Sequence, residues 1–93
     1  MKFETKPCAA FDCDERIKRR LLMCPHHWRM VSRDVQDRVI IALDNWQSAR
    51  GPAKAYIAAV AQAQLDVAIK EDLSPSIIAA FAADVKRHEE AAK

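Results

Sequence analysis

With 93 residues, the chain has room for one domain, and a domain of this size buries a smaller share of its surface than a typical one. Apolar residues make up 51% of the sequence, but many of them are alanines, each of which buries little surface. The formal net charge of +2 does not by itself indicate a nucleic-acid-binding protein, because such proteins concentrate their positive charge. We therefore expect a single domain, residues 1–93, with a small core that needs additional support.

The N-terminal third holds the chain's most distinctive residues. Residues 1–7 are polar and show no periodicity, so we expect them to be irregular. Residues 8–28 contain all three cysteines and two of the three histidines, which indicates a metal-binding knot. Pro25 suits the first turn of a helix, so a short helix is expected to begin there and to include His26 to Val31.

Three longer helices are expected to follow, in a scaffold that spans residues 33–91. The first covers residues 33–49, with Ser32 as its N-cap. The second covers residues 52–71, after the only glycine, Gly51, which is expected to adopt the left-handed conformation that ends a helix. The third covers residues 75–91.

Apolar residues recur at helical spacing along each of these segments and predict an inward face. The faces consist of Val35, Val39, Ala42, Leu43 and Trp46 with Ile40 beside them, then Tyr56, Val60, Ala63 and Val67 flanked by Ile57, Ala61, Leu65 and Ala68, and finally Ile77, Ile78, Phe81, Ala82 and Val85. The expected fold class is all-α, a small bundle of about four helices with an N-terminal zinc knot.

Neither an export signal nor a membrane span is expected. Residues 1–7 include Glu4 and lack the apolar run of a signal peptide. The longest apolar stretch, residues 55–69, is interrupted by two glutamines and an aspartate. We expect a soluble protein of the cytoplasm without a membrane partner.

The spacing of the cysteines and histidines indicates a structural zinc site. Such a site has four tetrahedral ligands, usually thiolates and imidazoles. Cys8 and Cys13 form a C-x4-C pair, while Cys24 and His27 form a C-x2-H pair whose i, i+3 spacing places both on one helix face. His26 lies roughly 200° from Cys24 around that helix and is expected to point away. We predict that Cys8, Cys13, Cys24 and His27 bind a structural Zn²⁺, because four protein ligands leave no open position for a catalytic water.

Two other interpretations of the cysteines stay open at this point. Three free buried cysteines would behave as small apolar residues, although polar neighbours such as Asp12 and Asp14 argue against that setting. A disulfide between Cys8 and Cys13 would leave Cys24 unused. An odd number of cysteines, beside histidines, favours metal binding over a disulfide framework.

Positive charge is concentrated around the same segment. Between residues 16 and 38, seven basic residues oppose two acidic ones, whereas six basic residues oppose seven acidic ones from residue 39 onward. The candidate nucleic-acid-binding residues are Arg16, Lys18, Arg19, Arg20, Arg29 and Arg33. Basic residues at this density can replace the counterions of a phosphate backbone, but they can equally balance a zinc site of three thiolates, whose net charge is −1.

The motif LMCPHHWRMV, placed after a C-x4-C pair, resembles a family of small zinc-finger-like proteins of phages and bacteria. These proteins share C-x4-C or C-x2-C, a basic spacer, L-x-C-x2-H-W and an amphipathic helix. The matching residues are Cys8, Cys13, Cys24, His27, Trp28 and Val31. The chain departs from the pattern at Ser32, where proline often follows the valine, and at Asp14-Glu15, which replaces a small or proline-containing turn. The resemblance implies zinc binding, a phage or prophage origin and a bacterial host cell, but no established activity.

No enzyme signature is present in the sequence. A single glycine excludes the phosphate-binding loops of nucleotide enzymes, and the H-x-E element of zinc deaminases is missing. We therefore expect a non-catalytic zinc-binding accessory factor that contacts nucleic acid through its basic segment. The alternative is a protein–protein interaction module or an inhibitor of a host defence or transcription protein, an idea that depends on analogy.

Overall fold

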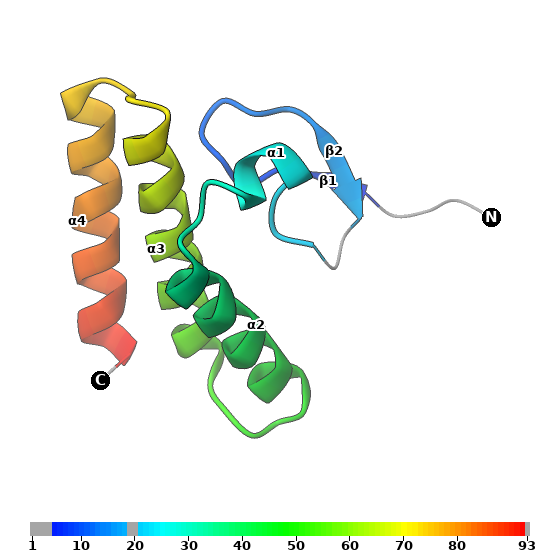
Figure 1. Ribbon diagram of the computed structural model, residues 1–93. Helices are drawn as coiled ribbons and strands as arrows, with labels where there is room; N and C mark the ends of the chain where they lie inside the picture. The colour runs from blue at the N-terminus through cyan, green and yellow to red at the C-terminus, as the bar shows by residue number, and fades with distance from the viewer. Residues whose placement is uncertain (1–4, 19–20, 93) are drawn as a thin grey trace.

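The computed structural model describes residues 5–18 and 21–92 (Figure 1). It is mostly helical, as expected, and it adds a small sheet that the sequence did not predict. The elements in chain order are β1 (Thr5–Pro7), β2 (Arg16–Lys18), α1 (Pro25–Trp28), α2 (Arg33–Gln47), α3 (Ala53–Lys70) and α4 (Pro75–Ala92). Among the described residues, none of the helices combines the length and the apolar character that a bilayer crossing requires.

Residues 5–31, which we call the N-terminal unit, begin with the two strands. β1 and β2 pair antiparallel, with Thr5 opposite Lys18 and Pro7 opposite Arg16. The prediction of an irregular segment over residues 1–7 is therefore wrong for residues 5–7, and residues 1–4 lie outside the described part of the chain. A strand of three residues is too short to show a period of two in the sequence, so only its pairing with β2 defines it.

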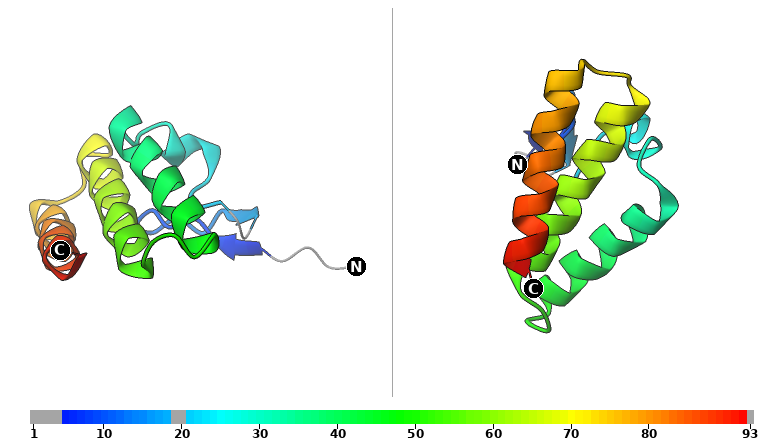
Figure 2. Two further views of the ribbon diagram at one scale, coloured as in Figure 1. Left: turned by 90° about the horizontal axis from the view of Figure 1, so that it is seen from below. Right: turned by 90° about the vertical axis from the view of Figure 1, so that its left-hand side faces the viewer.

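The three long helices form the other part of the molecule, and α3 lies between α2 and α4 (Figures 1 and 2). The N-terminal unit lies beside the C-terminal half of α3 (Figure 1), and Phe11 of the unit contacts Phe81 of α4, with ring centroids 6.1 Å apart. Each of the three helices begins and ends within two residues of its expected bounds. The periodicity of the sequence thus defined the helices, but it did not define how they pack.

One cluster of buried residues joins the two parts. Its members are Cys8, Ala10, Ile17, Met23, Cys24 and Val31 from the N-terminal unit, Val39 from α2, and Ala59, Ala63 and Val67 from α3. The small side chains of α3 allow the N-terminal unit to approach the helix backbone closely. By contrast, no residue of α4 is fully buried.

The inward faces expected from the sequence are correct only in part. Val39 is buried, but Trp46 is 46% exposed and Ile40 is 57% exposed. On α4, Phe81 is only partly buried and Ala82 is exposed. A helix in so thin a molecule contacts its neighbours through a narrow stripe, so the edges of each apolar face stay in water.

The helix corners also differ from expectation. Gly51 does not adopt a left-handed conformation; that conformation belongs to Ala49, with φ 58°. The Ala49 N–H donates to the Trp46 carbonyl at 3.1 Å and the Arg50 N–H to the Asn45 carbonyl at 2.7 Å, which is the Schellman pattern. A Cβ at Gly51 would instead lie 3.1 Å from the Cβ of Asn45, which is a tight contact, so glycine relieves crowding at this corner.

Ser32 precedes α2 as expected, but its side chain does not cap the helix. Its N–H and hydroxyl both donate to Asp66 Oδ2 of α3, at 3.2 and 3.0 Å. These bonds attach the start of α2 to α3. Gln64 of α3 likewise contacts the N-terminal unit, because its side-chain amide donates to the Ala9 carbonyl at 2.9 Å.

Candidate metal centre

The four predicted ligands come from three parts of the N-terminal unit. Cys8 directly follows β1, and Cys13 lies in the turn between the strands. Cys24 is the N-cap residue of α1, and His27 lies within that helix. The Cys8 N–H donates to the Glu15 carbonyl at 2.9 Å, which holds the base of the turn that carries Cys13. Strand pairing and one helical turn thus bring the two halves of the sequence motif together.

The ligand atoms converge as a single ion requires. The three thiol sulfurs and one His27 nitrogen all lie within 4.8 Å of one another. His27 Nδ1 is 3.6 Å from Cys8 Sγ and 3.2 Å from Cys24 Sγ. Tetrahedral zinc with Zn–S of about 2.3 Å and Zn–N of about 2.0–2.1 Å places a sulfur and a nitrogen ligand about 3.5 Å apart. The two sulfur–nitrogen distances therefore match those around a tetrahedral zinc ion.

Burial and thiol state agree with a metal site. Cys8 and Cys24 are each 5% exposed, and His27 is 8% exposed. All three cysteines are free, so the disulfide alternative between Cys8 and Cys13 is not what the structure contains. The convergence of three thiols on one imidazole also argues against three unrelated core cysteines, which would have no reason to meet at one point. Soft sulfur ligands with one imidazole are the donor set that zinc prefers.

The pKa values of the cluster reflect how closely the groups lie. Burial raises the pKa of the Cys24 thiol, but hydrogen bonds with His27 and Cys8 outweigh burial, so the net pKa is lowered from 9.0. Burial lowers the pKa of His27, but hydrogen bonds and charge from Cys24 and Glu71 raise it above 6.5. The lowered pKa of Cys24 favours the thiolate form, which is the form that binds a metal ion.

Cys13 is the most accessible of the four groups. It is partly exposed and lines an open polar hollow together with Asp12, Asp14 and His26. A backbone hydrogen bond with Glu15 lowers the pKa of Cys13, but burial and the neighbouring thiols raise it to about 11. The crowding of three thiols thus opposes a third thiolate, and a bound cation would relieve that opposition.

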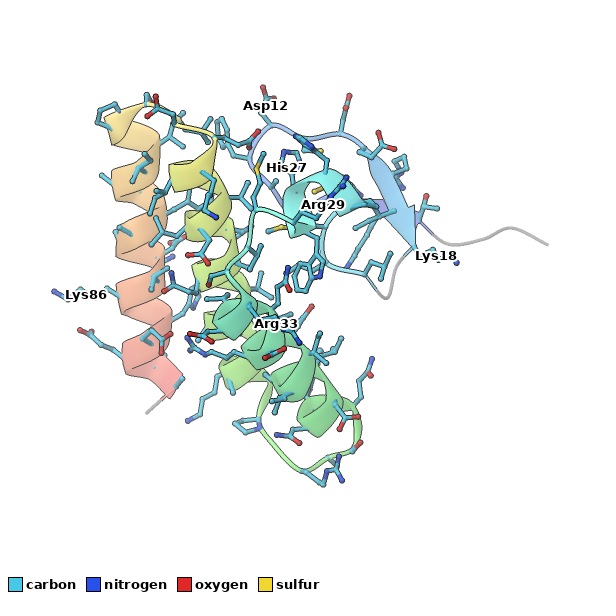
Figure 3. All side chains as sticks on the ribbon, in the orientation of Figure 1. Asp12, Lys18, His27, Arg29, Arg33 and Lys86 are labelled. Atoms are coloured by element: carbon cyan, nitrogen blue, oxygen red, sulfur yellow. The ribbon has the colours of Figure 1, made fainter. Side chains whose placement is uncertain are left out.

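Glu71 is a residue of this site that the sequence did not reveal as functional. Its carboxylate Oε2 lies 3.2 Å from His27 Nε2, the ring nitrogen opposite the one that faces the thiols. Figure 3 shows His27 between α1 and the C-terminal end of α3, where Glu71 lies. One signal was present in the sequence: Glu71 continues the four-residue spacing of Ala59, Ala63 and Val67 on α3.

His26 is exposed, as the helical geometry predicted. Its ring centroid is 5.0 Å from that of His27, and one atom each of His26, His27 and Glu71 also fall within 4.8 Å of one another. This second group shares His27 with the cysteine cluster. The cysteine cluster is the better metal site, because it offers four ligands rather than three and three of its members are thiols.

Two of the predicted nucleic-acid-binding residues lie at the end of α1 and at the start of α2. Arg29 follows α1, and its Nε donates to the Pro25 carbonyl at 3.1 Å. Arg33 begins α2 and forms an exposed ion pair with Asp37, with 3.4 Å between Nε and Oδ1. Both side chains are exposed (Figure 3). Their contacts are therefore with a carbonyl and a carboxylate rather than with the thiols.

The other predicted basic residues belong to the end of the sheet. Arg16 is exposed, and its guanidinium donates to the carbonyl and hydroxyl oxygens of Thr5, at 2.8 and 3.0 Å from Nη2. Lys18 is exposed at the end of β2, away from the helices (Figure 3). Arg19 and Arg20 lie outside the described residues. The described bases thus come from separate elements and do not form one compact patch.

A groove of about 250 Å³ separates the N-terminal unit from α2, and its lining is mainly apolar. It is lined by Leu21, Leu22, Met23, Pro25 and Trp28 from the unit, by Val39, Ile40 and Leu43 from α2, and by Tyr56 from α3. Trp46, expected in the core, lies exposed and stacks on Tyr56, with ring centroids 5.7 Å apart. Trp28 is partly buried against the core, as expected.

Comparison of the chain with models of protein families, with curated protein sequences and with solved structures gives no significant match. The resemblance to small phage and bacterial zinc-finger-like proteins therefore stays a prediction.

Proposed function

We propose that this protein is a non-catalytic zinc-binding module in which one structural Zn²⁺ holds the N-terminal unit on the helices, and that the unit together with the start of α2 contacts nucleic acid. The observation that carries the first half is the convergence of four ligand atoms within 4.8 Å at Cys8, Cys13, Cys24 and His27. A complete set of protein ligands supports a structural rather than a catalytic metal, since catalytic zinc keeps a position for water or substrate.

The metal assignment is tested by metal analysis of protein purified under reducing conditions. We expect about one zinc per chain in the wild type. Cys24→Ser and His27→Ala should lose the metal, whereas His26→Ala should retain it and serve as the matched control on the adjacent, exposed imidazole. Retention of zinc by His27→Ala together with its loss from His26→Ala would contradict the ligand set.

Nucleic-acid contact is supported by the exposure of three basic side chains, Lys18 at the end of β2, Arg29 after α1 and Arg33 at the start of α2. Fluorescence anisotropy with short duplex and single-stranded DNA, over a series of salt concentrations, measures it directly. Each lost phosphate contact should reduce the slope of log K against log salt by about 0.9, so the charge reversals Arg29→Glu and Arg33→Glu should weaken binding and flatten the salt dependence.

Lys86→Glu is the control for that experiment, because Lys86 lies on α4, on the side of the molecule away from Lys18 (Figure 3). It changes the net charge by the same amount without changing the proposed contact surface. Absence of binding at low salt, or equal effects of Lys86→Glu and Arg29→Glu, would rule out the nucleic-acid function.

The apolar groove favours a second candidate function, the recognition of another protein. Ile40 is 57% exposed and Leu21 is 42% exposed at the groove, so both offer apolar surface to a partner. An Ile40→Asp variant should keep its fold and its metal, because the side chain already contacts water. If this variant loses a protein that co-purifies from bacterial lysate while Arg29→Glu keeps it, the interaction function is the better description.

A further inference from the structure

The two nitrogens of His27 face different parts of the molecule. Nδ1 faces the thiols of Cys8 and Cys24, and Nε2 lies 3.2 Å from Glu71 Oε2. A histidine that binds a metal through Nδ1 in its neutral form carries its proton on Nε2. In that state the Nε2–H group donates a hydrogen bond to the Glu71 carboxylate, which determines both the tautomer and the orientation of the ring.

The position of Glu71 is unfavourable unless it has such a partner. Glu71 is the C-cap residue of α3, where the partial negative charge of the helix end disfavours a carboxylate. Its side chain is only 25% exposed, so it has also lost part of its hydration. A glutamate without a partner at this position would be expected to extend its carboxylate into water. Its contact with His27 supplies the compensating interaction.

The backbone at Glu71 is held in place on both sides. On the helix side, Ala59, Ala63 and Val67 belong to the buried cluster and share the face that Glu71 continues. On the other side, residue 72 is left-handed with φ 55°, and the N–H groups of residues 72 and 73 return to the carbonyls of residues 69 and 68, both at 3.1 Å. This Schellman turn makes Glu71 the end of a rigid helix rather than part of a loop.

We propose that Glu71 is a positioning residue for the metal ligand His27, and that this contact links the imidazole of the metal centre to the C-terminal end of α3. The proposal rests on the proposed zinc function. Carboxylates that orient a metal-bound histidine make the ligand more basic, and loss of such a partner typically weakens metal binding 10–100-fold. Metal binding and the docking of the N-terminal unit on α3 are then parts of one event.

A rival role for Glu71 is that of a metal ligand in the group with His26 and His27. The two roles differ in what the cysteines do. If Glu71 only positions His27, the metal keeps its sulfur ligands in every Glu71 variant. If Glu71 is a ligand of a second site, the metal survives Cys24→Ser and is lost from Glu71→Ala.

The test measures zinc affinity by chelator competition in Glu71→Ala, Glu71→Gln and Asp66→Ala. Glu71→Ala should bind zinc 10–100-fold more weakly than the wild type. Glu71→Gln should recover part of the loss, because its amide oxygen still accepts the Nε2–H bond. Asp66→Ala is the matched control: Asp66 is also on α3 and also contacts the segment that leads from the unit, through Ser32, but it does not touch His27.

Two spectroscopic readouts separate positioning from simple structural damage. With Co²⁺ in place of zinc, the sulfur-to-metal absorption should be the same in the wild type and all three variants, because the ligands are unchanged. The His27 Nε2–H proton should exchange slowly with water in the wild type and rapidly in Glu71→Ala.

Four results would overturn the proposal: wild-type affinity in Glu71→Ala, an equal loss in Asp66→Ala, a change of the Co²⁺ spectrum when Glu71 is replaced, or retention of zinc by Cys24→Ser. In the first two cases the zinc function stands without the positioning role. Failure of the wild type to bind zinc or cobalt would overturn the zinc function as well.

Discussion

Removal of the metal is expected to unfold the helical core and not only the N-terminal unit. Six of the ten residues in the buried cluster belong to that unit. The other four, Val39 on α2 and Ala59, Ala63 and Val67 on α3, would face water if the unit came away. α4 offers no replacement, because none of its described residues is fully buried.

The expected loss of stability is large compared with the total stability of a small domain. Structural zinc binds zinc-finger peptides with about 10–16 kcal/mol at neutral pH, while whole domains have a free energy of unfolding of about 5–15 kcal/mol. Because the ion binds the folded form, free zinc at about 1,000 times its Kd raises the free energy of unfolding by about 4.1 kcal/mol. For a domain of this length, that corresponds to an increase of the Tm by roughly 15–30 °C.

Far-UV circular dichroism in reducing buffer, with free zinc set by a metal buffer, measures both the extent of unfolding and the Tm. α1 has 4 helical residues, against 15, 18 and 18 in α2, α3 and α4. Local unfolding would therefore remove only a small part of the helical signal, whereas the shared core predicts the loss of most of it. Cys24→Ser should resemble the chelated wild type and should not respond to zinc. A chelated protein that keeps its helical signal and a Tm independent of free zinc would refute this reasoning.

Two further predictions concern the helices. Ala49→Gly should raise the free energy of unfolding by about 0.5–1 kcal/mol in a chemical denaturation experiment. A left-handed alanine costs about 1–2 kcal/mol, and part of the gain on replacing it is lost because glycine has more conformational entropy in the unfolded chain. Ala83→Gly, the same change at an exposed position inside α4, should lower the free energy of unfolding by about 1 kcal/mol, and equal effects at both sites would exclude the backbone explanation. Burial raises the pKa of Tyr56 above 10.0, so the folded protein holds the phenolic proton more tightly than the unfolded chain does and the free energy of unfolding should fall as the pH rises past 10.0. Tyr56 is the only tyrosine, so the absorbance of tyrosinate reports this titration directly, and a midpoint at or below that of a free tyrosine would contradict it.

The helices and the proposed ligands were accessible from the sequence because both depend on residues that lie close together along the chain. Helical periodicity and the proline at the start of α1 act over a few residues. The cysteine and histidine spacings likewise specify two ligand pairs without knowledge of the fold. That is why Cys8, Cys13, Cys24 and His27 could be proposed as ligands from the sequence, whereas the pairing of β1 with β2 and the turn of α1 bring the two pairs together.

The features that the sequence did not reveal depend on contacts between distant segments. The two strands are too short to show a pattern, and only their pairing across the Cys13 turn forms them. Trp46 belongs to an apolar stripe but stays 46% exposed, although one face of its ring stacks on Tyr56 of α3. Glu71 looks like an ordinary surface carboxylate at the end of a helix.

Sequence alone therefore determined the local features of this protein, namely helices, helix starts and a set of side chains that could hold a metal ion. The tertiary structure decided which apolar residues are buried and which carboxylate meets the far side of His27, since His27 and Glu71, 44 positions apart in the sequence, are brought together only by packing on α3. Local propensities act through neighbouring residues, whereas burial and hydrogen-bond partners depend on the whole fold.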